Sequence, residues 1–339
     1  MKKFLVLLLS LLMLLSLVGC TKKEEPANEP EVLVEAYPVT VKDQAGREVT
    51  IESEPEKLVS GYYISTSTCI ALGLKDKLVG IEAKAKSRPI YSLSAPELID
   101  LPNVGSAKEF DLEGCIALEP DLVILPKKLK DAAETISELG IPVLLVNPED
   151  ETLLEEMVTL IGTATGKTEE AAKLLAFNDK YQEDLVAKNA NVTKPTVYLA
   201  GNSDILSTAG KSMYQSTMIE LAGGTNVAED ITDTYWAEIS LEQLLAYDPE
   251  YIVIASEAGY TVEDVLNNSD LAMLTAVKEG KVLKMPSTAE SWDSPVPSSV
   301  LGSVWLSSKL HPETTSDDFA KEVINEYYET FYGFTYPEQ

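Results

Sequence analysis

The chain has 339 residues, which is enough for two domains of ordinary size. Its 55 Asp and Glu residues outnumber its 27 Lys and Arg, for a formal net charge of −28, and such a surface repels the phosphates of nucleic acids and of anionic lipids. The single histidine, His311, argues against a direct zinc or manganese site and against a hydrolase that depends on histidine.

The first residues have the pattern of an export signal. Lys2 and Lys3 precede an apolar run over residues 4–18, which is shorter than the roughly 20 residues of a membrane-spanning helix. Residues 17–20, Leu-Val-Gly-Cys, resemble the lipobox of bacterial lipoproteins, in which the cysteine is lipid-modified and becomes the new N-terminus. The resemblance implies a signal peptide over residues 1–19 and a palmitate-bearing anchor on Cys20. The protein would then be attached to the extracytoplasmic face of the cell membrane through that lipid alone.

Residues 20–37 are rich in Lys, Glu, Pro and Asn and poor in large apolar side chains. A segment of this kind cannot bury a core, so we expect a flexible tether there.

Short apolar runs that alternate with helical patterns make up the rest of the chain. This alternation is typical of parallel sheets covered by helices. The runs that we expect to form strands lie at residues 58–59, 78–81, 122–125 and 142–146, and then at 196–200, 251–254 and 281–285.

An internal repeat indicates that the chain contains two similar units. Residues 112–125 align without a gap on residues 241–254. Each copy has a short helix with an acid in its first turn, then an acid and a proline that end the helix, then an apolar strand. The repeat predicts two lobes of the same α/β design.

One uninterrupted helical pattern from Thr168 to about Ala190 lies between the two copies. We therefore expect an α/β fold of two lobes, each a mainly parallel sheet with flanking helices, joined by a single long rigid helix. The expected boundaries are 38–166 for the N-terminal lobe, 167–190 for the bridging helix and 191–339 for the C-terminal lobe, which ends in a helix.

Several short motifs, in this order and spacing, resemble one known family. They are Asp-Gln-Ala-Gly-Arg at 43–47, Leu-Gly-Leu at 72–74, Glu-Pro-Asp-Leu-Val at 119–123, Leu-Ala-Gly-Gly-Thr-Asn at 221–226 and Leu-His-Pro-Glu at 310–313. Together they are similar to the iron-complex and cobalamin (class III) solute-binding proteins of ABC importers. The resemblance implies a monomeric binding protein, not an enzyme and without a cofactor. Such a protein captures a metal chelate (a corrinoid, haem or a ferric siderophore) and delivers it to the permease.

The same resemblance implies how the permease is recognised. The family docks through one surface glutamate on each lobe, and the matching positions here are Glu113 and Glu242, which are equivalent in the repeat. Each glutamate would also stabilise the N-terminus of its own helix.

Ligands of open α/β sheets bind beyond the carboxyl ends of the strands. Among the loop residues, Trp236 matches a ligand-packing tryptophan of cobalamin-binding relatives. Trp292 could either contact the ligand or hold its loop in place. The loops at these strand ends supply our ligand-binding candidates, which are Tyr62, Tyr63, Arg88, Lys108, Lys127, Ser207, Tyr235, Trp236 and Trp292.

Arginine is scarce, since Arg47 and Arg88 are the only two. Catecholate siderophores are commonly bound by clustered arginines, so a neutral or weakly charged chelate is favoured. A resemblance of residues 291–306 to members that bind molybdate leaves an oxyanion as an alternative. Cys69 and Cys115 are expected to be buried thiols, with a disulfide as the alternative.

Overall fold

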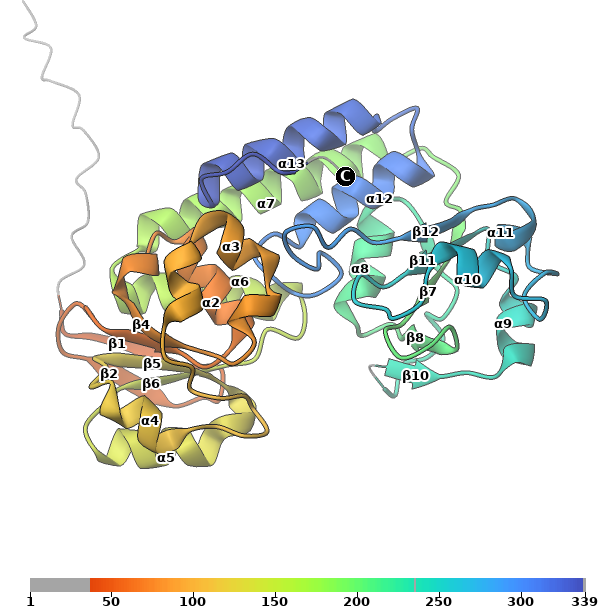
Figure 1. Cartoon of the computed structure of the whole chain (residues 1–339). Coiled ribbons are helices and arrows are strands. Elements are labelled where there is room, and N and C mark those ends of the chain that lie inside the picture. Colours follow the sequence, from red (N-terminus) through yellow and green to blue (C-terminus); the bar gives the residue numbers. More distant parts are fainter. Residues whose placement is uncertain (1–36, 235, 338–339) are drawn as a thin grey trace, which may run out of the picture. The chain divides into compact units, whose positions relative to one another are not determined.

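The computed structural model describes residues 37–234 and 236–337, and Ala36–Gln339 form one compact unit (Figure 1). The expected signal peptide, the anchor at Cys20 and the candidate Tyr235 lie outside the described residues. Within the described ranges, no helix has both the length and the apolar character needed to cross a membrane.

The first half of the unit holds a four-stranded sheet in which every strand pair is parallel. The strand order is β4-β3-β5-β6, and a separate antiparallel hairpin precedes these strands. The strands are β1 (Val39–Lys42), β2 (Glu48–Ile51), β3 (Leu58–Ser60), β4 (Leu78–Ile81), β5 (Leu122–Pro126) and β6 (Val143–Val146).

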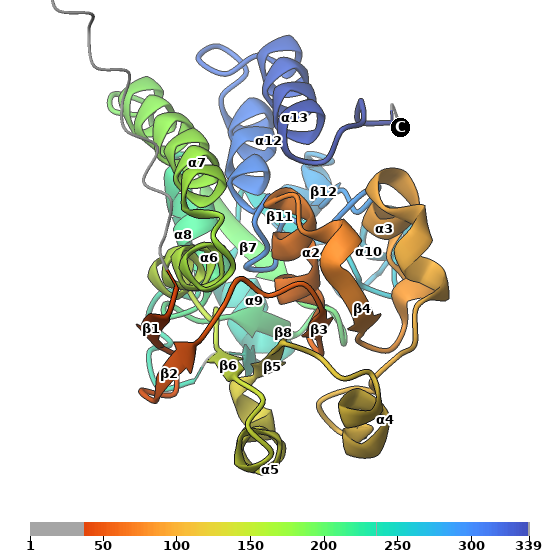
Figure 2. The same ribbon diagram turned by 90° about the vertical axis from the view of Figure 1, so that its left-hand side faces the viewer.

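Helices cover both faces of this sheet because its strands are apolar on both faces. Leu58 and Ile124 face one core with helices α2 and α6, while Val59 and Val123 face another core with α4 and α5. Figure 2 shows α4 and α5 across the sheet from α2 and α6. The helices of this half are α2 (Tyr63–Ala71), α3 (Pro89–Ser94), α4 (Leu112–Ala117), α5 (Lys130–Glu138), α6 (Glu151–Thr165) and the 3-10 turns Lys75–Lys77, Ala85–Ser87, Pro96–Asp100 and Lys127–Leu129.

The second half holds a six-stranded sheet with a parallel centre and an antiparallel edge. Strand β7 pairs in parallel with β9 and β11, and β11 with β12, whereas β8 and β10 pair antiparallel. The strands are β7 (Thr196–Ala200), β8 (Ser207–Ala209), β9 (Thr225–Asn226), β10 (Trp236–Glu238), β11 (Tyr251–Ile254) and β12 (Val282–Lys284), and the helices are α8 (Tyr214–Leu221), α9 (Leu241–Tyr247), α10 (Val262–Leu266), α11 (Thr275–Lys278), α12 (Val300–Leu310) and α13 (Asp317–Phe331).

The predicted long helix is α7, which spans Thr168–Lys188. It lies beside α12 and α13 (Figure 1). The ring of Phe177 on α7 lies 5.3 Å from Tyr327 and 5.6 Å from Phe331, both on α13. The aromatic C-terminal helix is therefore packed into the core. One apolar cluster contains side chains of both sheets and of these three helices.

The repeat is visible in the backbone as well as in the sequence. The helix–strand turns contain Glu119 at φ 50° and Asp248 at φ 41°, equivalent acids in the left-handed region. Two residues further on, the carboxylate of Asp121 accepts a hydrogen bond from the backbone N–H of Lys57, next to β3. Glu250 accepts one in the same way from the N–H of Thr196, at the start of β7. Each copy thus ties its turn to the neighbouring strand.

The α/β fold with parallel sheets and flanking helices is confirmed, and the antiparallel edge of the second sheet is an addition to it. Cys69 and Cys115 are buried free thiols. His311 is buried at the end of α12, where its Nε2 lies 3.0 Å from the carbonyl oxygen of Gly223. A structural role for this histidine follows.

Candidate ligand-binding site

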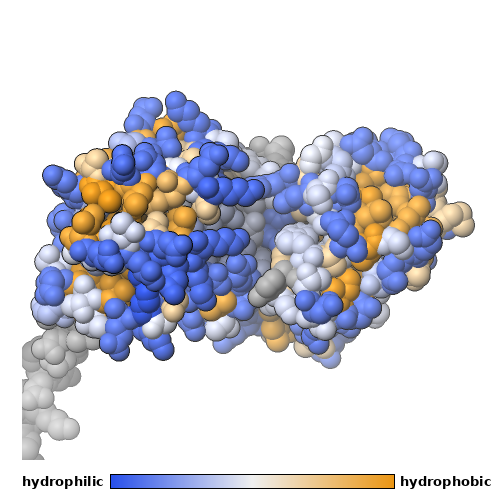
Figure 3. Space-filling view, turned by 90° about the horizontal axis from the view of Figure 1, so that it is seen from below, coloured by the Kyte–Doolittle hydropathy of each residue, from blue (hydrophilic) through white to orange (hydrophobic). Residues whose placement is uncertain are grey.

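Two adjacent cavities lie beyond the carboxyl ends of the parallel strands. The Arg88 cavity has a volume of about 200 Å³ and the Trp236 cavity about 250 Å³, and Tyr63 and Glu257 line both. Seen from below, the surface of this unit is hollowed between its two halves, with hydrophilic and intermediate residues at the border (Figure 3).

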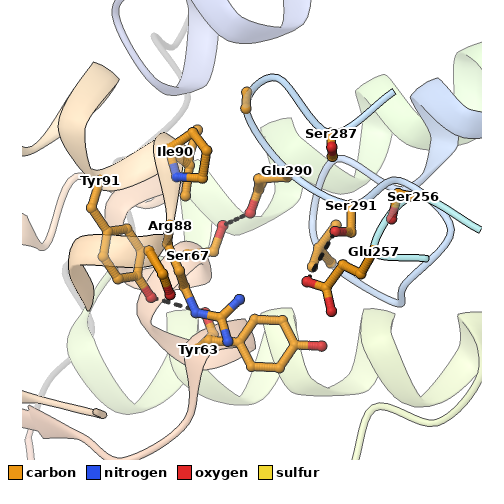
Figure 4. Close-up of a pocket in the computed structure, with 14 residues that line it drawn as sticks. Tyr63, Ser67, Arg88, Ile90, Tyr91, Ser256, Glu257, Ser287, Glu290 and Ser291 are labelled. Atoms are coloured by element: carbon orange, nitrogen blue, oxygen red, sulfur yellow. Dashed lines mark hydrogen bonds between the residues drawn. The ribbon is translucent and has the colours of Figure 1, made fainter. Parts of the chain in front are cut away.

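Arg88 presents a fixed cation in the first of these cavities. Its guanidinium carbon lies 3.8 Å from the centre of the Tyr63 ring (Figure 4), and its Nε lies 3.5 Å from a carboxylate oxygen of Glu82. Glu82 is itself buried and accepts hydrogen bonds from the hydroxyls of Thr66, at 2.6 Å, and Tyr91, at 2.7 Å. Ring and carboxylate together orient the guanidinium.

A buried carboxyl supports the floor of the same cavity. Glu290 accepts hydrogen bonds from Ser67 on α2, at 2.5 Å, and from Ser298, at 2.6 Å. The hydroxyl of Tyr332 lies 2.8 Å from that of Ser67. Burial raises the pKa of Glu290, so its proton is held more tightly than in water. The network links α2 to the loop before α12 and to the chain after α13.

Serine side chains form part of the rest of the Arg88 cavity, beside the apolar side chains of Pro89, Ile90 and Val296. Ser87, Ser256, Ser287 and Ser291 line it. Across the cavity from Arg88, the exposed carboxylate of Glu257 accepts a weak hydrogen bond, 3.3 Å long, from Ser291 (Figure 4). The cavity therefore combines one cation with serine hydroxyls, of which those of Ser87, Ser256 and Ser291 already donate to other oxygens of the protein.

The Trp236 cavity is lined by aromatic rings. The rings of Tyr62 and Tyr63 meet edge to face with centres 5.2 Å apart, and Trp236 is unusual in being 39% exposed. Tyr214 and Gln215, at the start of α8, complete this wall. The amide of Gln215 donates a 2.6 Å hydrogen bond to the carbonyl oxygen of Asp293.

Four of the predicted ligand residues thus lie together, namely Tyr62, Tyr63, Arg88 and Trp236. Lys108 and Lys127 are exposed and line neither cavity. Ser207 lies in β8, where its side chain is buried.

Trp292 differs most from its expected place. It is 1% exposed, donates its indole N–H to the Tyr328 hydroxyl at 2.8 Å, and packs against the ring of Tyr336. The large apolar ring is buried in the core beneath α13, so no face of it is open to a ligand. This side chain has the alternative role of holding its loop in place.

Several cavity residues were not among the candidates. Glu149 and Ser256 each follow a parallel strand within three residues, a signal that the sequence does contain. Ser67 and Gln215 lie inside helices, and no sequence pattern distinguishes them from core residues.

Glu113 and Glu242 occupy equivalent exposed positions in the first turns of α4 and α9. Each helix has a side-chain cap, from Asp111 in one case and from Ser240 in the other. In the described part of the chain, no group of three or more His, Cys, Asp or Glu side chains is arranged to hold a metal ion.

The chain is similar in sequence to known binding proteins. The profile of a family described as periplasmic binding protein matches residues 58–289. The molybdate-binding protein MolA of Haemophilus influenzae is 28% identical over 323 residues, covering 87% of this chain and 91% of MolA. The Fe(3+)-citrate-binding protein YfmC of Bacillus subtilis is 27% identical over 248 residues, covering 71% of this chain and 76% of YfmC.

Solved structures share the fold over nearly the whole described body. MolA bound to molybdate, the cognate binding protein of an ABC transporter, gives a TM-score of 0.76 at 25% identity and covers 88% of this chain and 99% of MolA. A periplasmic solute-binding protein from Veillonella parvula gives 0.77 at 25% identity, with 88% and 94% covered.

Proposed function

The chain belongs to the periplasmic binding protein family, and we propose that, as the solute-binding protein of an ABC importer, it captures a compact, oxygen-rich anion in the Arg88 cavity. The observation that carries this proposal is the oriented guanidinium of Arg88 among serine hydroxyls. Guanidinium groups bind oxyanions through paired hydrogen bonds.

The size of the cavity supports a small solute. Its volume of about 200 Å³ is below the roughly 300–1,000 Å³ of pockets that enclose drug-sized ligands. A corrinoid is larger than a drug-sized ligand, so this cavity alone would not enclose one. MolA, which shares the fold and most of its length with this chain, is described as binding molybdate. A tetrahedral oxyanion of the molybdate class is therefore our first candidate.

A metal chelate that spans both cavities is the second candidate. The exposed ring of Trp236 favours it, because a flat chelate packs on an aromatic face. A relative described as binding Fe(3+)-citrate shows that compact chelates occur among similar proteins.

Calorimetric titration of the purified protein with molybdate, tungstate, sulfate, ferric citrate, cobinamide and haem separates the candidates. We expect molybdate or tungstate to bind, and Arg88→Ala to weaken that binding by roughly 10- to 100-fold, because a charge-assisted contact is lost. Lys194→Ala, which removes an exposed cation far along the chain, serves as the matched control. Oxyanion binding that is unchanged in Arg88→Ala would rule out the first candidate, and binding of chelates alone would favour the second.

Delivery to the permease completes the proposal, with Glu113 and Glu242 as docking acids and the lipid on Cys20 as the anchor. Their exposure and their equivalence in the repeat suit a permease with two similar halves. Reversing both acids to Lys should abolish uptake into cells while the affinity for the solute stays unchanged. A matching loss of affinity would contradict the docking role, and a Cys20→Ser protein that stayed in the membrane fraction would contradict the anchor.

A further inference from the structure

The Trp236 cavity shares the carboxylate of Glu257 with its neighbour but lacks the neighbour's cation. No lysine or arginine is among the described residues that line it. Two exposed carboxylates, Glu149 and Glu257, do line it, and within the described ranges neither forms an ion pair. A third acid, Asp293, is buried, and its oxygens accept hydrogen bonds from Ser256.

Four aromatic rings complete the lining, those of Tyr62, Tyr63, Tyr214 and Trp236. The faces of such rings carry negative potential and attract cations, most strongly in the case of tryptophan. Burial, followed by the neighbouring Tyr63 and then Glu149, raises the pKa of the Tyr62 hydroxyl, and Arg88 opposes this shift. Rings and carboxylates therefore disfavour an anion here and favour a positive group.

We propose that the Trp236 cavity is a subsite for an organic ammonium group. A bare metal ion does not fit, because the described residues offer no cluster of three metal ligands. A cation with an apolar shell matches both the ring faces and the peripheral carboxylates.

Because Tyr63 and Glu257 line both cavities, one solute can reach both. This inference rests on the proposed oxyanion site at Arg88. It specifies that the natural solute carries its oxyanion as a group joined to an ammonium group, and that molybdate probes the anionic part alone. The anionic part would lie at Arg88 and the ammonium group at Trp236.

Tetramethylammonium chloride is the direct probe of the subsite. We expect it to bind to the purified full chain in calorimetric titrations at constant ionic strength, where potassium chloride gives no signal. Glu149→Gln and Trp236→Leu should each weaken this binding by about tenfold. Glu322→Gln, which removes an exposed carboxylate on α13, should leave it unchanged. Absence of tetramethylammonium binding would overturn the subsite. Binding as tight in Glu149→Gln and Trp236→Leu as in the original chain would overturn it as well.

Molybdate titrations on the same preparations distinguish this inference from the proposed function. Molybdate binding without tetramethylammonium binding overturns the subsite alone, whereas the reverse result supports the subsite and overturns the proposed anion. Phosphocholine, which carries both charges, tests whether one solute reaches both cavities. It should compete with both single probes, and competition with only one of them would overturn the bridging arrangement.

Discussion

The two cavities share a wall but use their acidic residues differently. Behind the Arg88 cavity, Glu82 and Glu290 are buried, and their oxygens are occupied by hydroxyl donors, so these carboxyls hold the wall in place. Glu149 of the Trp236 cavity and Glu257, which lines both cavities, are instead exposed, and no cation among the described residues forms an ion pair with them. The same residue type therefore organises the protein in one place and faces the solute in the other, and burial decides which.

The largest expected effect tests the structural role of the buried acids. Glu290→Ala removes the acceptor for two buried hydroxyls and leaves a gap, so we expect the free energy of unfolding to fall by about 3 kcal/mol. Glu257→Ala, an exposed acid of the same site, should change it by less than about 0.5 kcal/mol. Urea denaturation measures both, and equal losses would remove the distinction between buried and exposed acids.

A second effect concerns Glu151, the first residue of α6, which accepts a hydrogen bond from Gln182 of α7. Burial, followed by the charge of Glu155, raises the pKa of Glu151 from 4.5 to about 7. The folded protein thus holds this proton more tightly than the unfolded chain. The stability that it contributes is complete below about pH 4.5 and is lost as the pH rises through 7, by up to about 3 kcal/mol.

Glu151→Gln should remove most of that pH dependence. The difference in unfolding free energy between pH 5 and pH 8 is the quantity to measure, with Glu322→Gln as the control. If Glu151→Gln kept the full pH dependence of the original chain, another group would be responsible for it.

A smaller effect concerns Glu82, whose substitution should change the affinity for molybdate but not the affinity for tetramethylammonium. Glu82→Gln keeps a hydrogen-bonding group beside Arg88 but removes the charge, so molybdate affinity should fall about fivefold. Tetramethylammonium affinity should not change, because Glu82 does not line that cavity. Equal weakening of both ligands would point to a general distortion instead of an altered Arg88.

The smallest effect concerns Trp236. Since its ring is substantially exposed, Trp236→Ala should alter the free energy of unfolding by no more than about 0.5 kcal/mol. It should nevertheless remove any fluorescence change on adding tetramethylammonium, because neither of the other two tryptophans, Trp292 and Trp305 of α12, lines this cavity. A large loss of stability would show that the ring packs as part of the core.

The strands, the repeat and the long helix were predictable because each depends on a pattern of residues that are close together in the sequence. Apolar runs of four or five residues became β5, β6, β7 and β11, and the uninterrupted helical pattern became α7. The family assignment and the absence of enzymatic function are confirmed by the family match and the relatives. The lobe boundaries remain a proposal.

The site was predictable where its residues lie in the loops beyond strand ends or match the family pattern. Tyr62 and Tyr63 directly follow β3, Arg88 lies in the longer loop after β4, and Trp236 of β10 was found by the family resemblance. Trp292 was misplaced because its environment comes from α13, whose residue Tyr328 is 36 positions away in the chain. Ser67 meets Glu290 across 223 positions, and no local pattern records such a contact.

The apolar cluster shared by both sheets has a consequence for how the protein gains and loses its structure. Ile124 of one sheet and Val197 of the other belong to the same cluster, together with Leu174 of α7. Neither half can separate without exposing this shared surface to water. The body should therefore melt in a single cooperative transition instead of two. A half expressed alone would expose this apolar surface and be prone to aggregation. Each copy of the repeat therefore needs the other half of the protein to stay soluble, just as the ligand site needs residues from both halves.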